Sequence, residues 1–130
     1  MFFVRKIYCY SKDGENPLAV FAGNFNEKIK RKLRFVLRYA ADEKNPLREP
    51  HVKHFTIEKY KRLYELRMKA SNTMIRIIYF HIGDDIVLLH AFVKRDKRDT
   101  EQALEFSLKM IEKIDKHISE TNDFLTEVTL

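Results

Sequence analysis

The chain has 130 residues, of which 45% are hydrophobic and 34% charged, and its formal net charge is +6. This balance is typical of a globular protein with one core, and the chain has no run of apolar residues long enough to span a membrane. Cys9 is the only cysteine, which excludes disulfide scaffolding and a cysteine-based zinc site. We therefore expect a single domain over residues 1–130, located in the cytoplasm, without a cofactor.

The positive charge is concentrated in the middle of the chain. Residues 24–69 carry 14 lysines and arginines against 6 acidic residues, whereas residues 99–130 carry 3 against 8. A basic body with an acidic C-terminal region is typical of a protein that binds a polyanion. An ordinary solvated surface, on which folding mixes the charges, explains the count equally well.

The N-terminal third predicts a strand followed by a basic helix. FFVRKIYCY is rich in aromatic and β-branched residues, so it predicts a strand that ends at the turn formers KDGENP. From Asn24, an N-cap with Glu27 three residues on, apolar residues recur at helical spacing as far as Ala40. The exposed side of this helix is predicted to bind the phosphates of a polyanion through Lys28, Arg31, Lys32, Arg34 and Arg38.

A loop and a first sheet strand are expected next. The prolines of DEKNPLREP (42–50) interrupt any helix, and a short helical or extended piece follows near residues 57–60. LYELRMK (63–69) then alternates between apolar and charged residues. This alternation predicts a half-buried strand with a charged, open face.

Residues 74–82 and 86–93 predict the two central strands of the sheet, because both are strongly apolar and Gly83-Asp84-Asp85 joins them as a turn. A helix is then expected from Thr100, capped by Thr100 or Asp99. Residues 119–130 are acidic and lack helical periodicity, so they predict either a loose tail or an edge strand.

Cations from three consecutive strand segments would meet if these strands pair in order. Guanidinium groups suit phosphate, because they form paired hydrogen bonds and stay charged at any working pH. Arg76, alone in an apolar strand, has an alternative role in an ion pair with an acid such as Glu65. The predicted anion-binding residues of this region are Arg67, Lys69, Arg76, Lys94, Arg95, Lys97 and Arg98.

His90 lies in the apolar strand VLLHAF, in line with Lys94. It is a candidate for acid–base chemistry, although a histidine in such a strand is more often a core residue. The other histidines show no convincing metal-ligand spacing, with His51 and His54 only a weak signal. No metal site is predicted.

The stretches LYELRMKASNTMIRIIYF and IVLLHAFVKRDKR, followed by an amphipathic helix, resemble the HigB-like branch of the RelE/ParE toxin superfamily. The match covers roughly residues 60–118, and the N-terminal strand and basic helix also fit it. The resemblance implies an α+β fold, with a small twisted, mainly antiparallel sheet and helices packed on one face. It also implies a phage-derived toxin of a type II toxin–antitoxin system.

Such a toxin is a metal-independent endoribonuclease that cuts mRNA, usually on the ribosome, and a cognate antitoxin neutralises it. A helix-turn-helix antitoxin is the partner that the resemblance implies. By the same resemblance, Arg67 lies on the strand that carries a substrate-binding or general-base cation, and Arg76 matches the arginine that stabilises the phosphate. Lys94 and Arg95 match the basic residues that follow the last central strand.

Two positions depart from the family pattern. Several relatives use a tyrosine near the start of the last helix, and this chain has no tyrosine after Tyr79. Glu65 stands where some relatives have a second basic residue. The acid–base pair therefore stays open, with His90 and Lys97 as candidates. A non-catalytic nucleic-acid-binding module and a toxin that inhibits DNA gyrase are the alternatives.

Overall fold

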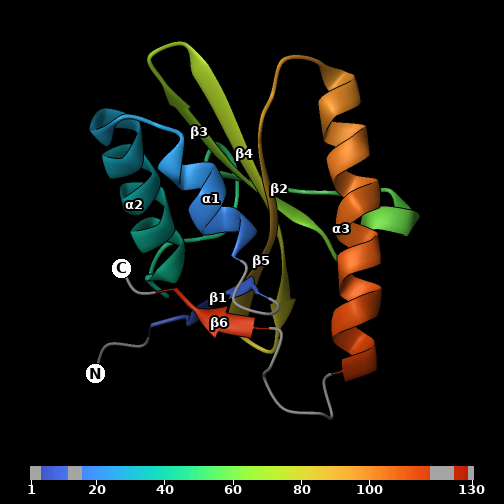
Figure 1. Cartoon of the computed structure of the whole chain (residues 1–130). Coiled ribbons are helices and arrows are strands. Elements are labelled where there is room, and N and C mark those ends of the chain that lie inside the picture. The colour runs from blue at the N-terminus through green and yellow to red at the C-terminus, as the bar shows by residue number, and fades with distance from the viewer. Residues whose placement is uncertain (1–3, 12–15, 118–124, 129–130) are drawn as a thin grey trace.

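The computed structural model describes residues 4–11, 16–117 and 125–128 (Figure 1). In chain order the elements are β1 (Ile7–Tyr10), α1 (Pro17–Gly23), α2 (Glu27–Ala41), β2 (Val52–His54), the 3₁₀ helix η1 (Glu58–Tyr60), β3 (Tyr64–Ala70), β4 (Thr73–Ile82), β5 (Asp85–Val93), α3 (Lys97–His117) and β6 (Leu125–Glu127). None of the helices in these ranges is both long and apolar enough to cross a membrane.

The strands form one six-stranded sheet in the order β2-β3-β4-β5-β1-β6. All neighbours are antiparallel except β1 and β5, which run parallel. The α+β class and the mainly antiparallel sheet are therefore confirmed, as is the central place of the hairpin β4–β5. Within the predicted tail, residues 125–127 form the edge strand, whereas residues 118–124 lie outside the described residues.

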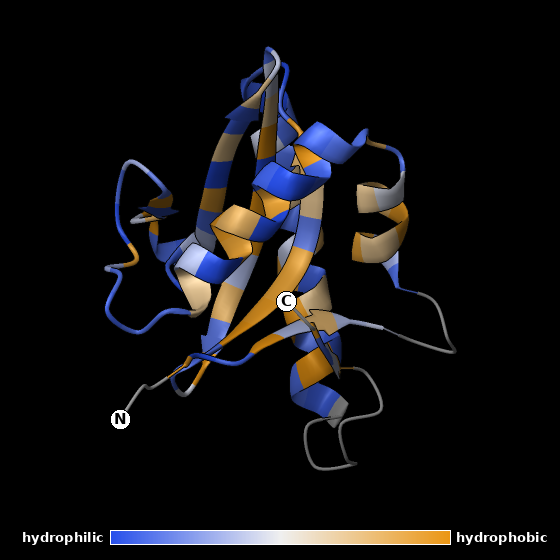
Figure 2. Cartoon of the chain, turned by 90° about the vertical axis from the view of Figure 1, so that its left-hand side faces the viewer, coloured by the Kyte–Doolittle hydropathy of each residue, from blue (hydrophilic) through white to orange (hydrophobic). Residues whose placement is uncertain are grey.

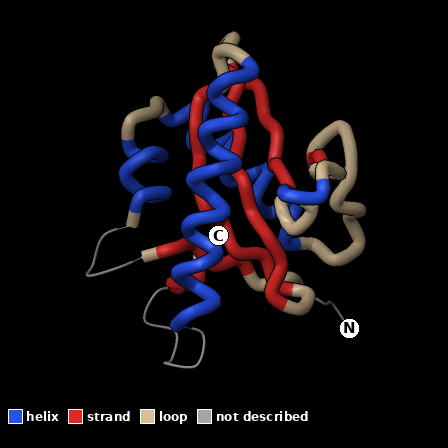
Figure 3. The backbone as a smooth tube through the Cα atoms, turned by 90° about the vertical axis from the view of Figure 1, so that its right-hand side faces the viewer, coloured by secondary structure: helices blue, strands red, loops and turns tan. Residues whose placement is uncertain are grey.

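Helices cover both faces of the sheet. Ile77 and Tyr79 of β4 pack in the core on the side of α1 and α2, whereas Ile78 and Phe80 pack in the core beneath α3. Figures 1 and 3 show α3 lying along its face of the sheet, with the short 3₁₀ helix η1 beside it. The prediction that all helices pack on one face is wrong, because β4 and β5 are apolar on both faces and each face needs a cover. 

The helix that the sequence predicts from Asn24 begins later, at Glu27, and a shorter helix precedes it. Asn26 caps α2, since its side chain accepts a hydrogen bond from the Ile29 amide at 3.0 Å. Asn24, the predicted N-cap, instead ends α1. The sequence did not predict α1 at all, because its seven residues are too few to show a helical period.

The last helix begins three residues before Thr100. Asp96 Oδ1 accepts hydrogen bonds from the amides of Arg98 and Asp99, at 2.8 and 3.3 Å, and Asp99 Oδ2 accepts from the Arg95 amide at 2.8 Å. These reciprocal bonds satisfy amides at the start of a helix. Lys97 and Arg98 therefore belong to the first turn of α3.

Candidate functional site

Two arginines meet on the face of the sheet that α3 partly covers. Arg67 of β3 is directly opposite Arg76 of β4, and Phe92 of β5 is opposite Arg76 on its other side. In the next row, Glu65 of β3 is opposite Ile78, which is opposite His90 of β5. Residues opposite one another on adjacent strands lie about 5 Å apart, so these side chains form one continuous patch.

Glu65 lies between the two arginines. Arg67 Nε donates to Glu65 Oε1 at 3.0 Å, and Arg76 Nε is 3.6 Å from the same oxygen. The Glu65 side chain is 1% exposed, although the alternating pattern places it on an open face. Like charges directly opposite each other destabilise a sheet, and the carboxylate offsets that repulsion here. The sequence pattern that could have predicted this role is a single acidic residue, Glu65, next to the cations Arg67 and Arg76 of two successive strands.

Arg76 is held in place by several partners. Its Nη1 donates to the backbone oxygens of Ile75 and Met68, at 3.2 and 3.4 Å, and the side chain is only 11% exposed. Burial lowers the pKa of Arg76, while Glu65 opposes the shift and Arg67 adds to it. The predicted alternative, an ion pair with Glu65, is therefore present. Arg67, at 27% exposure, is the more accessible guanidinium.

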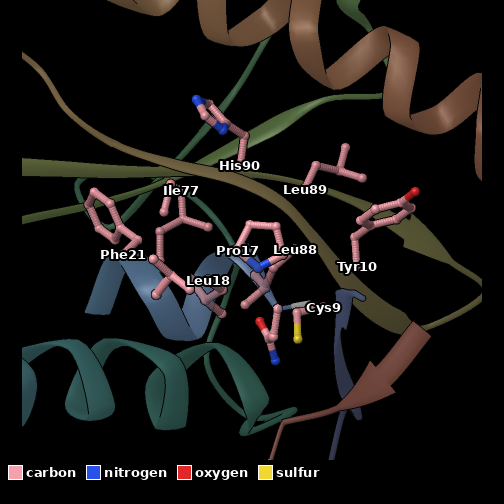
Figure 4. Close-up of a pocket in the computed structure, with 12 residues that line it drawn as sticks. Cys9, Tyr10, Pro17, Leu18, Phe21, Ile77, Leu88, Leu89 and His90 are labelled. Atoms are coloured by element: carbon pink, nitrogen blue, oxygen red, sulfur yellow. The ribbon is translucent and has the colours of Figure 1, made fainter. Parts of the chain in front are cut away.

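His90 projects from β5 away from Leu18 and Phe21 of α1 (Figure 4). Its ring centroid lies 5.9 Å from that of Phe92 and 4.6 Å from that of Phe106 in α3. Burial among these groups lowers the pKa of His90. A neutral imidazole at neutral pH can accept a proton, so the position suits a general base better than a general acid.

The remaining predicted cations of this region lie at the end of β5 and the start of α3, except Lys69, which lies near the end of β3. The Lys94 amide donates to Met74 O at 2.8 Å, which keeps Lys94 beside β4, and Lys69 of β3 is opposite Met74. Arg95 Nε lies 3.7 Å from Asp99 Oδ2. The side chains of Lys69, Arg95, Lys97 and Arg98 are exposed.

The basic helix does not join this patch. Its predicted cations are exposed on α2, which packs on the opposite face of the sheet. Phe35 lies among them at 59% exposure, with Lys32 Nζ 5.9 Å from its ring centroid. Figure 2, which views this face, shows hydrophilic and hydrophobic residues alternating along the helix and strands. The protein therefore has two separate basic surfaces.

Two half-buried histidines, His81 and His90, predict a loss of stability in mild acid. Burial lowers the pKa of both His81 and His90 below the usual 6.5, so the unfolded chain binds more protons than the folded one just below that pH. We expect the free energy of unfolding to fall as the pH is lowered from about 6.5. Asp99 and Glu105, whose pKa values are lowered from 3.8 and 4.5, contribute only at more acidic pH.

Urea unfolding at closely spaced pH values measures this dependence. His90→Phe should flatten the curve just below pH 6.5, because the substitution removes one of the two shifted groups. A curve that is already flat in the wild-type protein would contradict the prediction.

Across the described ranges, no three histidine, cysteine, aspartate or glutamate side chains gather so that they could hold a metal ion.

A family model described as phage-derived protein Gp49-like (DUF891) matches residues 21–118. This range includes both basic surfaces and the whole row from Arg67 to Phe92. No curated protein and no solved structure matches the chain.

Proposed function

The chain belongs to the Gp49-like family of phage-derived proteins, a family of RelE-like toxins of toxin–antitoxin systems, and from this premise we propose that it is an endoribonuclease that cuts mRNA. The observation that supports this most strongly is the pair Arg67–Arg76, bridged by Glu65 and next to His90. We place the protein in the HigB-like branch, acting in the cytoplasm on the translating ribosome. A helix-turn-helix antitoxin would neutralise it.

The proposed reaction needs no metal ion, because side chains hold the phosphate and move the protons. Arg67, Arg76 and Lys94 bind the scissile phosphate and stabilise the negative charge that develops on it. Neutral His90 takes the proton of the neighbouring 2′-hydroxyl, whose oxygen attacks phosphorus as the bond to the 5′-oxygen breaks. Lys97 supplies the proton to that leaving oxygen. The products are a 2′,3′-cyclic phosphate and a free 5′-hydroxyl.

The other cations would hold RNA around this centre. The exposed side chains of Lys69, Arg95 and Arg98 would contact flanking phosphates. Because α2 lies on the other face of the sheet, it would contact a different segment, which we assign to ribosomal RNA. Its contacts are Lys28, Arg31, Lys32, Arg34 and Arg38.

The role of α2 predicts a specific salt dependence. Lys28→Gln with Lys32→Gln should reduce the slope of log affinity against log salt for a ribosomal RNA fragment by about 0.7–0.9 for each lost phosphate contact. Filter binding at several salt concentrations measures the slope. Lys113→Gln with Lys116→Gln, which removes the same charge from exposed positions on α3, is the matched control. Equal slopes for both double variants would exclude α2 as the RNA-binding surface.

The function itself is tested in a translating extract with purified protein and a defined message. Discrete new 5′ ends, mapped by primer extension in the presence of the protein, are the expected result. The isolated message, with and without EDTA, measures how far cleavage depends on the ribosome or on a metal ion. Growth arrest on expression with intact message and inhibited supercoiling would contradict the proposal and favour gyrase as the target.

A further inference from the structure

The second half of β5 has an open edge. β1 pairs with β5 only along Ile86–Leu88, and no other described strand pairs with β5 on that side between Leu89 and Val93. The Lys94 amide donates to Met74 O in β4. Because successive backbone groups of a strand point to opposite sides, Ala91 and Val93 direct their N–H and C=O groups toward the open side.

A hollow of about 480 Å³ lies along this edge, between α1 and α3. Phe21 lines it from α1, Gln102 and Phe106 line it from α3, and His90 and Phe92 line it from β5. Phe106 is 46% exposed although it is large and apolar. Phe21, His90 and Ala91 also line the apolar pocket of Figure 4.

We propose that this hollow binds one base of the RNA substrate, an inference that rests on the proposed function and extends it. Aromatic side chains provide faces on which any base can stack. The backbone groups of Ala91 and Val93, with the Gln102 amide, offer donors and acceptors to the edge of that base. Binding of a phosphate alone would need neither the aromatic rings nor these backbone and amide groups.

The position of the hollow fits the proposed cleavage site. Phe92, which lines the hollow, is directly opposite Arg76 on the neighbouring strand, so this wall of the hollow lies beside the arginine pair. A nucleotide whose phosphate contacts the arginines can therefore place its base against Phe92 and Phe106. Sequence preference at this position would arise from the backbone groups and Gln102, because stacking itself tolerates every base.

An extended segment of a partner protein is the other occupant that an open strand edge can accept. Within the open stretch, Ala91 and Val93 are the residues that direct backbone groups outward, so an added strand would gain few ladder hydrogen bonds here. The edge then runs into the cations of the β5–α3 junction, Lys94 and Arg95. A short edge with aromatic walls and neighbouring cations favours a nucleotide over an added strand.

The test uses a short RNA whose cleavage site carries a 2′-deoxy sugar, so that it binds without reacting. One base at a time is replaced by the fluorescent analogue 2-aminopurine, whose emission falls when it stacks on an aromatic ring. We expect quenching at one position next to the cleavage site. Phe106→Leu, which keeps an apolar side chain but removes the ring, should abolish that quenching and weaken binding about 5- to 100-fold. Ile57→Leu, at another exposed apolar position, should change neither.

Every other outcome would contradict the proposal that the hollow binds an RNA base. RNA binding without quenching, or quenching unchanged in Phe106→Leu, would exclude it and leave the proposed function intact. Absence of binding to this RNA would also exclude it, and the extract assay would then decide the function separately. If Phe106→Leu left RNA binding unchanged but weakened neutralisation by the co-expressed antitoxin, the hollow would belong to the protein partner.

Discussion

Replacing Arg76 by alanine is expected to reduce mRNA cleavage by about 10²–10³-fold, the usual loss when one preorganised donor to a developing negative charge is removed. The side chain is 11% exposed and its Nη1 is held by two backbone oxygens. A phosphate bound at this position therefore meets a guanidinium that is already oriented. The rate is measured in the translating extract as the appearance of the new 5′ ends.

Two controls separate this loss from misfolding. Arg48→Ala removes an exposed arginine from the loop before β2 and should cleave at the wild-type rate. Arg76→Lys keeps the charge but loses the paired hydrogen bonds, so an intermediate rate is expected. A folded Arg76→Ala protein with the wild-type rate would remove Arg76 from the site. Parallel loss in Lys94→Ala would support a shared role for the two cations.

Replacing Glu65 by leucine is expected to cost about 3 kcal/mol in the free energy of unfolding, the low end of the range for removing one partner of a buried ion pair. The low end applies because Arg67 is 27% exposed and solvent screens part of its charge. The substitution leaves the two guanidiniums directly opposite each other without the carboxylate between them. Urea unfolding at pH 7 measures the change.

A double variant tests the cause of this loss. Adding Arg76→Met to Glu65→Leu removes both buried charges and should restore much of the lost stability, since an apolar pair often replaces a buried ion pair without cost. Glu49→Ala is the matched control, because this carboxylate is exposed and 3.8 Å from Arg67 Nη1. Glu49→Ala should change the free energy of unfolding by less than about 0.5 kcal/mol. Additive losses in the double variant would contradict the electrostatic explanation.

The sequence by itself determined the elements that are long and strongly periodic. The alternation of LYELRMK and the apolar runs of residues 74–82 and 86–93 predicted β3, β4 and β5, because side-chain direction in a strand repeats every two residues. It also determined which residue types were available to bind phosphate. Shorter elements such as α1 and β2 escaped prediction, since seven and three residues carry too little periodicity.

Only the tertiary structure decided which charges meet and which are buried. Arg67 and Arg76 share one patch because β3 and β4 pair in register, whereas the cations of α2 lie on the opposite face because that helix covers the other side of the sheet. Glu65 looks exposed in the alternating pattern and is buried in the fold. Local patterns specify the direction of a side chain, but its burial depends on the distant segments that pack over it.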